Sequence, residues 1–460
     1  MGWNFLSLVR IMVHTMPTLP YSTDALLRAL APIDIVIDSF YSSNQNNDPI
    51  ENDTTTQHLP NTFWSEKSQG NFASLIASVA RSNNGNSEDD WSTVSFLPSR
   101  RYIHKLVQRY VSRLQQEGDG AELENDRLAS LVCHFSMSSK KFGASTSGSF
   151  NSSIPDPLAS CMVSFRVPVI TPGNGRRHNK FAREDEPSKN DDDDHDDLLR
   201  IRVYPHHNDV GVAKVWEAGA CLAEYILRHP QVVRGRKVVE LGAGVGLTGL
   251  VAAAAAASRG FSGGRGDGED GRVVEKGDVF VHLTDYTEAC MENMVYNVEV
   301  NESWLKRRGV DPASVTVGTL EWSEYAQNEN NMVFSQTAES NPVYGSHGAN
   351  SIHALSNADV ILAADVVYDV HSIPDLVSTV CKFLSSPWKS TNGNQNGEEK
   401  RAIFATTFRN QTTFGLFEKE LDKKGIICDY LSLDDVPFVF PCYFRQPRSD
   451  VRLCTMKLKR

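Results

Sequence analysis

The residues most capable of chemistry in this sequence surround a glycine-rich turn. Residues 236–249 read RKVVELGAGVGLTG: a short apolar run that carries Glu240, a turn with Gly242, Ala243 and Gly244, and the start of a helical tract. Glycine lets the backbone bend sharply there or approach a ligand closely. The spacing Gly-x-Gly-x-x-Gly also suits a dinucleotide, whose pyrophosphate would be disfavoured by an acid ahead of the turn. Glu240 therefore favours a positively charged ligand instead.

Two further candidates follow the next two expected strands. The apolar run 279–284 leads directly into Asp285, whose carboxylate could accept hydrogen bonds from both hydroxyls of a ribose. The alternative is that Asp285 only caps the helix that follows. The run 315–320 is followed by Trp322, which could stack on an adenine ring or be an ordinary core side chain.

The residues that follow a fourth expected strand indicate which class of substrate the protein acts on. The apolar run 358–364 ends at Ala364 and continues as Asp365, Val366, Val367 and Tyr368. Enzymes that methylate planar amino nitrogens often carry two prolines at this place, and this chain has none there. The pattern Asp-x-x-Tyr, together with Glu-x-Gly-x-Gly-x-Gly, instead resembles the seven-strand protein-lysine methyltransferases. The resemblance implies that S-adenosylmethionine is the cofactor and that the backbone near Ala364 contacts it.

The resemblance gives Asp365 and Tyr368 a chemical task. A lysine ammonium, with a pKa of about 10.4, must lose a proton before its nitrogen can attack a methyl carbon. Because a carboxylate favours the charged amine, Asp365 suits positioning of the incoming lysine better than its deprotonation. On this interpretation, replacing either residue lowers methyl transfer and leaves cofactor affinity nearly intact. The alternative is an aspartate that ends a strand and a tyrosine that fills the core.

The resemblance extends beyond these motifs. The stretch 211–225 resembles a segment of the same family in which a tryptophan, here Trp216, borders the cofactor; Glu217 stands where the family usually has Asp. Residues 405–417 resemble the fifth strand and following helix of the elongation factor 2 lysine methyltransferases, and residues 98–135 resemble their N-terminal helices more faintly. The resemblance therefore implies a protein substrate, with elongation factor 2 favoured. Three insertions are longer than such a domain requires: 258–278, 323–357 and 386–398.

The order of the expected elements predicts the architecture that would position these residues. Strands and helices alternate from residue 198, and two late strands, 427–433 and 451–458, have no helix between them. We expect a Rossmann-like α/β domain over 198–460 with a mostly parallel seven-strand sheet and one antiparallel edge hairpin. A helical N-terminal region with polar segments precedes it over 1–136. A Ser-rich and then highly charged linker spans 137–197.

Composition limits the expected binding partners of the protein and the compartment in which it works. The chain has 460 residues and a formal net charge of -11, which argues against broad nucleic-acid binding. Its eight cysteines are scattered without the spacing of a metal site, which is typical of a reducing compartment. No apolar run reaches the roughly 18 residues of a membrane span. We expect a cytoplasmic monomer without a metal ion that binds neither nucleic acid nor membrane directly.

The sequence thus predicts an S-adenosylmethionine-dependent protein-lysine N-methyltransferase acting on elongation factor 2. The alternatives are a methyltransferase for another protein or a small amine, and a non-catalytic module that keeps the fold. Substrate choice requires a surface wider than one lysine pocket. Arg101, Lys105, Arg109 and Arg113 recur at four-residue spacing and would form one basic helical stripe for an acidic partner, unless they form an ordinary solvated helix face.

Overall fold

The computed structural model describes twelve parts of the chain. They are residues within 23–40, then 65–77, 80–82, 94–96, 100–117, 125–132, 160–168, 197–258, 279–327, 351–387, 399–443 and 446–459. Most of the polar segments and of the three insertions that the sequence indicates lie outside these ranges.

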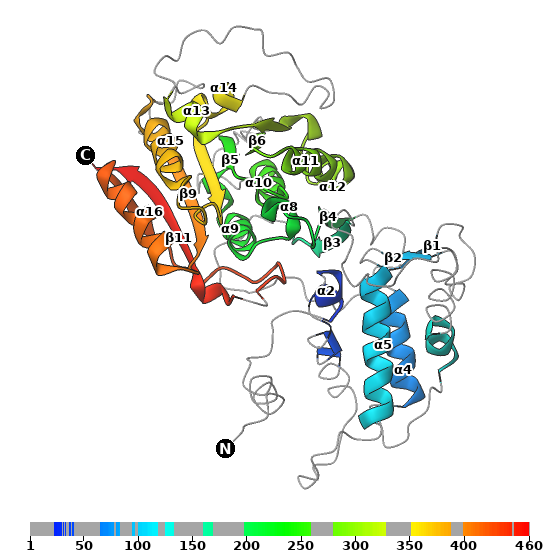
Figure 1. Cartoon of the computed structure of the whole chain (residues 1–460). Coiled ribbons are helices and arrows are strands. Elements are labelled where there is room, and N and C mark those ends of the chain that lie inside the picture. The colour runs from blue at the N-terminus through cyan, green and yellow to red at the C-terminus, as the bar shows by residue number, and fades with distance from the viewer. Residues whose placement is uncertain are drawn as a thin grey trace, which may run out of the picture.

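A seven-stranded sheet forms the centre of the α/β domain (Figure 1). Its strand order is β10-β11-β9-β8-β5-β6-β7. The strands are β5 (Lys237–Leu241), β6 (Phe280–Asp285), β7 (Val315–Thr319), β8 (Val360–Ala364), β9 (Arg401–Thr407), β10 (Ile426–Tyr430) and β11 (Val451–Leu458). Strands β5 to β9 are parallel to one another, and β11 is antiparallel to both β9 and β10. The predicted sheet is confirmed, with the last strand inserted between β9 and β10.

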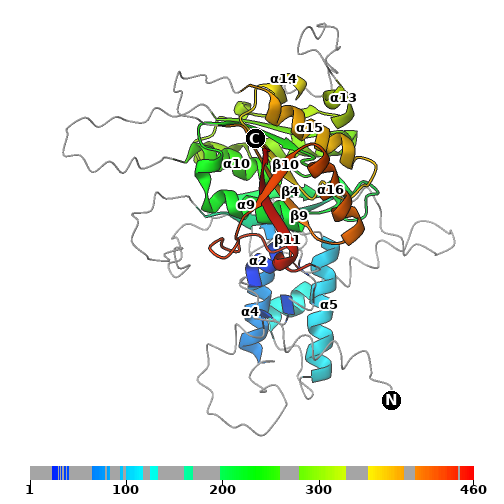
Figure 2. The ribbon, with the colours of Figure 1, turned by 90° about the vertical axis from the view of Figure 1, so that its left-hand side faces the viewer.

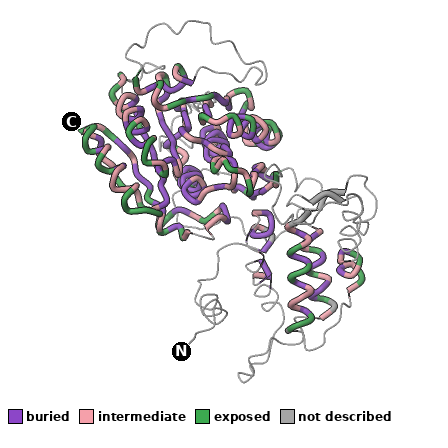
Figure 3. Tube along the Cα trace, in the orientation of Figure 1, coloured by how far each residue is buried: buried purple, intermediate pink, exposed green. Residues whose placement is uncertain are grey.

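Helices cover both faces of this sheet because successive strand residues point to opposite sides. Val238 belongs to the buried cluster under α9, α10 and α11, whereas the adjacent Val239 belongs to the cluster under α14, α15 and α16. Figure 3 shows the buried residues concentrated on the strands and on the inner sides of these helices. The helices are α8 (Val210–Ala213), α9 (Glu217–Arg228), α10 (Leu247–Ala257), α11 (Glu288–Val300), α12 (Glu302–Arg307), α13 (Trp322–Gln327), α14 (Ser351–Ser356), α15 (Ile373–Ser385) and α16 (Gln411–Lys423).

The sheet has a topological switch between β5 and β8. From β5 the chain adds β6 and then β7 on one side, and then returns to add β8 and β9 on the other. The loops that leave β5 and β8 at their carboxyl ends therefore diverge. Open parallel sheets bind ligands in the crevice that such a divergence creates.

A small antiparallel sheet lies beside α11. It pairs β3 (Cys161–Arg166) with β4 (Leu198–Val203), and Val163 and Phe165 join the buried cluster on one face of the seven-stranded sheet. Asn297 on α11 accepts a hydrogen bond from the Arg202 backbone N–H at 2.8 Å and donates to the Val245 carbonyl at 2.9 Å. The expected linker 137–197 thus contains a strand that packs with the α/β domain, because its alternate residues are apolar enough to be buried there.

The helical N-terminal region has a buried cluster of its own. Its elements are α2 (Thr23–Arg28), α4 (Glu66–Ala77), β1 (Ala80–Ser82), β2 (Val94–Phe96) and α5 (Arg100–Glu117). The rings of Phe72 on α4 and Tyr110 on α5 stack with centroids 3.8 Å apart. This cluster shares no residue with the two clusters of the sheet, and Figure 2 shows α4 and α5 beyond one end of the sheet. Within the described residues, no helix is both long and apolar enough to span a membrane.

Candidate active site

The glycine turn lies at the carboxyl end of β5, at the topological switch. Gly242 and Gly244 have φ angles of 61° and 55°, in the left-handed region that side chains rarely adopt. A Cβ on Gly244 would lie 2.8 Å from the carbonyl oxygen of Gly211, so two backbone segments meet here without room for a side chain. A Cβ on Gly242 would lie 2.7 Å from Val366, which follows β8. The turn thus fits tightly between the segment before α9 and the loop after β8.

Asp285 ends β6 next to this turn. Its carboxylate accepts hydrogen bonds from the backbone N–H groups of Gly244 at 3.0 Å and Tyr286 at 2.8 Å. Burial raises its pKa, and these backbone hydrogen bonds act in the opposite direction. A carboxylate has about four acceptor sites, so its two oxygens can accept further hydrogen bonds from ligand hydroxyls. The geometry therefore fits the predicted ribose role, and Asp285 also fastens the turn to β6.

Glu240 faces the interior of the protein. Its side chain is buried, and its carboxylate accepts a hydrogen bond from the Gly249 backbone N–H at 2.8 Å. Burial raises the pKa of Glu240 to about 8, despite hydrogen bonds from Thr248 and Gly249. The sequence indicated a charge placed for the ligand, whereas the structure places this carboxyl under the first turn of α10. There it braces the helix and hence the glycine turn.

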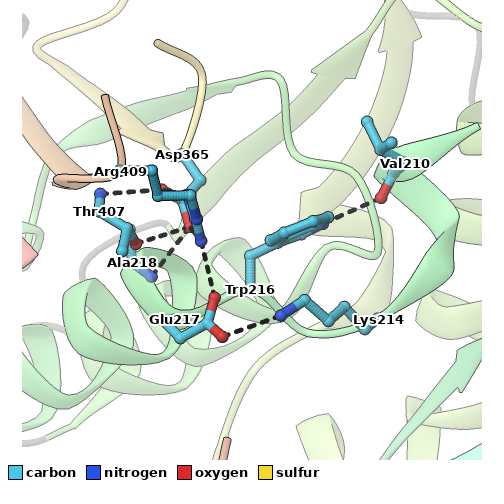
Figure 4. Close-up of polar contacts among 8 residues, drawn as sticks. All are labelled: Val210, Lys214, Trp216, Glu217, Ala218, Asp365, Thr407 and Arg409. Carbon is cyan, nitrogen blue, oxygen red and sulfur yellow. Dashed lines mark hydrogen bonds and ion pairs between the residues drawn. The ribbon is translucent and has the colours of Figure 1, made fainter. Parts of the chain in front are cut away.

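The two candidate tryptophans and Ala364 lie around the same turn. Trp216 caps the start of α9 and donates from its indole to the Val210 carbonyl at 2.9 Å (Figure 4). Trp322 begins α13, and its ring lies 3.6 Å from where a Cβ on Gly242 would be. Ala364 is the last residue of β8, the strand beside β5. The fold therefore gathers all three at the switch.

Asp365 occupies a position that the sequence did not reveal. It has a φ angle of 53°, a left-handed conformation uncommon outside glycine but tolerated by aspartate. Its carboxylate accepts from the backbone N–H of Ala218 at 3.2 Å and from the backbone N–H and hydroxyl of Thr407 at 2.9 and 3.0 Å. Arg409 adds two hydrogen bonds, at 2.9 and 3.2 Å. The side chain is only 6% exposed, and these five hydrogen bonds direct its carboxylate at donors of the protein itself.

Arg409 is the functional candidate that the sequence pattern missed. It follows β9 and also donates to the carboxylate of Glu217 at 2.7 Å, while Lys214 donates to the other oxygen of that carboxylate at 2.9 Å (Figure 4). Its guanidinium carbon lies 5.1 Å from the centroid of the Trp216 ring. An arginine in a loop after a strand gives no local signal of such partners, which lie 44 and 192 residues away.

Tyr368 and Tyr286 are large aromatic side chains that remain exposed near this edge, at 57% and 65%. Partial desolvation raises the pKa of Tyr368 to about 12, and nearby Tyr286 and Asp285 contribute in the same direction. Its hydroxyl therefore stays protonated at neutral pH. Tyr286, which the sequence analysis did not single out, follows Asp285 directly and gives the site a second exposed aromatic surface.

Comparison with known proteins agrees with this geometry. A family model described as lysine methyltransferase matches residues 194–337, a span that holds Trp216, the glycine turn and Asp285. Residues 194–337 belong to the lysine methyltransferase family. Asp365, Tyr368 and Arg409 lie beyond the matched span of this methyltransferase domain.

Individual relatives of the methyltransferase domain are distant. Human protein-lysine N-methyltransferase EEF2KMT is 26% identical over 216 residues, which cover 46% of this chain and 50% of that protein. The protein N-terminal and lysine N-methyltransferase efm7 of Schizosaccharomyces pombe is 36% identical over 102 residues, which cover 22% of this chain and 31% of that protein. The chain thus spans half or less of the length of these curated relatives. The solved magnesium protoporphyrin IX methyltransferase of Synechocystis PCC 6803 is 12% identical with a TM-score of 0.28, covering 53% of this chain and 79% of that one.

Proposed function

We propose that this protein is an S-adenosylmethionine-dependent protein-lysine N-methyltransferase that acts on elongation factor 2. The observation that carries the proposal is the convergence at one sheet edge of the glycine turn, Asp285, and the Asp365-to-Tyr368 segment. These come from the carboxyl ends of β5, β6 and β8, which are neighbouring parallel strands. The membership of residues 194–337 in the lysine methyltransferase family supports the same activity.

The residues at the turn fit the cofactor. Asp285 keeps acceptor capacity for the ribose hydroxyls, and Trp322 and Tyr286 offer aromatic surfaces for the adenine ring. Gly242 and Gly244 expose backbone where any side chain would clash or be strained. Trp216 and Ala364 would border the ligand from α9 and β8. When bound, S-adenosylmethionine supplies an electrophilic methyl group on a sulfonium.

The exposed hydroxyl of Tyr368 would meet the substrate lysine. Because its raised pKa keeps it protonated, the phenol oxygen can accept a hydrogen bond from the amine without removing its proton. The proton that the ammonium must lose can pass to water, since the tyrosine is more than half exposed. Asp365 would act indirectly, by holding the backbone from which Tyr368 projects. The main work of the protein is then alignment of the amine, which is the dominant contribution in a displacement of this kind.

Elongation factor 2 is the substrate that the likeness of residues 405–417 favours. The test is transfer of a radiolabelled methyl group from S-adenosylmethionine to elongation factor 2 purified from cells that lack this protein. We expect a labelled lysine with the native protein and strongly reduced labelling with Tyr368→Phe. Arg228→Ala is a matched control, because Arg228 is an exposed arginine at the far end of α9, where it pairs with the Asp435 carboxylate and donates to the Asp435 backbone carbonyl.

The outcomes separate the substrate from the activity. Label in another protein of a cell lysate, with none in elongation factor 2, would refute the substrate and leave the lysine methyltransferase activity in place. Label at a protein N-terminus instead of a lysine would refute the lysine assignment. No transfer to any protein, with intact cofactor binding, would favour the non-catalytic alternative.

A further inference from the structure

Arg409 joins two buried carboxylates that come from different elements. Its guanidinium donates to both oxygens of Asp365, at 2.9 and 3.2 Å, and to Glu217 at 2.7 Å (Figure 4). The carboxylate side chains are 6% and 1% exposed, whereas the arginine side chain is 34% exposed. A guanidinium carries five N–H donors in a rigid planar fork, so it can bind two carboxylates at once in fixed geometry. A lysine ammonium at the same place offers a point charge and no such fork.

These contacts connect three segments that surround the proposed cofactor site. Asp365 lies just beyond β8, Glu217 begins α9 directly after Trp216, and Arg409 lies between β9 and α16. Asp365 also accepts from the backbone N–H groups of Ala218 and Thr407, which belong to the second and third of these segments. The three side chains, which we call the Arg409 clamp, therefore fix the end of β8 relative to the start of α9.

The backbone beyond Asp365 depends on this connection. Asp365 is held in a left-handed conformation, and Val366, the next residue, fills the space beside Gly242. Two residues later the same segment carries Tyr368, whose side chain is exposed. A shift at Asp365 would therefore move both the surface against the glycine turn and the proposed lysine-binding hydroxyl. Displacements of about 1 Å in a reacting pair are enough to lower a rate by about 100-fold.

The clamp also determines which group meets the substrate amine. Asp365 accepts five hydrogen bonds: two from Arg409, one from the backbone N–H of Ala218, and two from the backbone N–H and hydroxyl of Thr407. This is more than the roughly four acceptor sites of a carboxylate. An incoming ammonium would have to displace a bidentate guanidinium to reach it. The substrate lysine is thus directed to Tyr368, and the cation partner of Asp365 is internal to the protein.

We propose that Arg409 is a positioning residue for methyl transfer, which holds the loop after β8 through Asp365 and Glu217 so that Tyr368 is aligned with the amine. This inference rests on the proposed function. It predicts that Arg409→Ala lowers kcat for methyl transfer by at least about tenfold, while KM for the protein substrate changes by less than about threefold. Added guanidinium, which can occupy the vacated space, should restore part of kcat in Arg409→Ala and have no such effect on the native protein.

Arg409→Lys separates alignment from charge. It keeps the positive charge and much of the fold but loses the fork, so we expect kcat between those of the native protein and of Arg409→Ala. Arg228→Ala serves as the control, with native kcat. The thermal unfolding midpoint of each variant is measured alongside. If Arg409→Ala does not fold, the kcat and KM of Arg409→Lys test the proposal in its place.

Two results would overturn the assignment. Native kcat in a folded Arg409→Ala, or in Arg409→Lys when the alanine variant does not fold, would show that the clamp does not align the site. A lower KM for the substrate in either variant would show that Asp365 binds the amine once Arg409 is removed. Both differ from failure of the proposed function, in which the native protein itself transfers no methyl group.

Discussion

Asp365→Ala should lower the stability of the protein strongly and Tyr368→Phe should leave it nearly unchanged, although both residues belong to one motif. Asp365→Ala removes an acceptor used by two backbone N–H groups, one hydroxyl and the Arg409 guanidinium. It also leaves Arg409 paired with the buried carboxylate of Glu217 alone. Tyr368→Phe removes one hydroxyl from a side chain that is more than half exposed.

The contacts of the two side chains determine how large the difference in stability between the two variants should be. Removing one partner of a buried ion pair costs about 3–5 kcal/mol, because the other charge is left without compensation. Arg409 is one third exposed and keeps its ion pair with Glu217, so the lower limit, about 3 kcal/mol, applies to Asp365→Ala. For a domain of this size that corresponds to a fall in Tm of about 6–12 °C. Tyr368→Phe should change stability by less than about 0.5 kcal/mol.

Thermal unfolding and methyl transfer, measured on the same preparations, test this argument. We expect Asp365→Ala to melt early and to lose activity. Tyr368→Phe should keep its Tm and lose activity, and Asp365→Asn, which retains shape and part of the hydrogen bonding, should lie between the two in stability. An Asp365→Ala protein with native Tm would refute the clamp as described. An early-melting Tyr368→Phe would show that this tyrosine is structural.

Three further predictions concern the rest of the molecule. Burial raises the pKa of Glu240 from 4.5 to about 8. The stability that Glu240 contributes is therefore fully present below pH 4.5 and is lost as the pH rises through 8. In Glu240→Gln, the free energy of unfolding measured with denaturant should fall less between about pH 5 and pH 8 than in the native protein. Asp285→Ala should weaken S-adenosylmethionine binding by about 1–3 kcal/mol in calorimetry, and unchanged affinity would remove Asp285 from the site. Deleting residues 1–136 should spare cofactor binding and weaken methylation of elongation factor 2, with full activity placing recognition in the catalytic domain. Deleting 1–197 should also lower Tm, because it removes β3 from β4.

Much of the fold and part of the site could be predicted from the sequence because they depend on neighbouring residues. The apolar runs and the helical tracts between them predicted a parallel sheet, and the late strands without a helix predicted the antiparallel pairing of β10 and β11. The glycine turn follows β5 directly, and Asp285 is the last residue of β6. Once parallel strands are adjacent, their carboxyl ends meet at one edge, so such residues converge without any further information.

Other features of the structure could not be predicted from local sequence patterns. The strand Cys161–Arg166 lies before a long charged stretch and was assigned to a linker, because nothing nearby indicates that its partner begins at residue 198. Asn297 on α11 hydrogen-bonds the backbone of Arg202 in β4, a role that a buried asparagine in a helix does not reveal. The direction in which Glu240 points was equally hidden, since a strand residue faces one side or the other according to what covers the sheet.

The sequence by itself thus determined the kind of domain, the positions of its turns and the residue types available for chemistry, because these follow from periodicity and local backbone preference. Only the tertiary structure decided what each side chain meets. Asp365 and Arg409 are 44 residues apart, and Arg409 and Glu217 are 192 apart. Their contact exists because the strand order places the ends of β8 and β9 beside the start of α9. An acid that the pattern assigned to the substrate is therefore bound to an arginine of the protein itself.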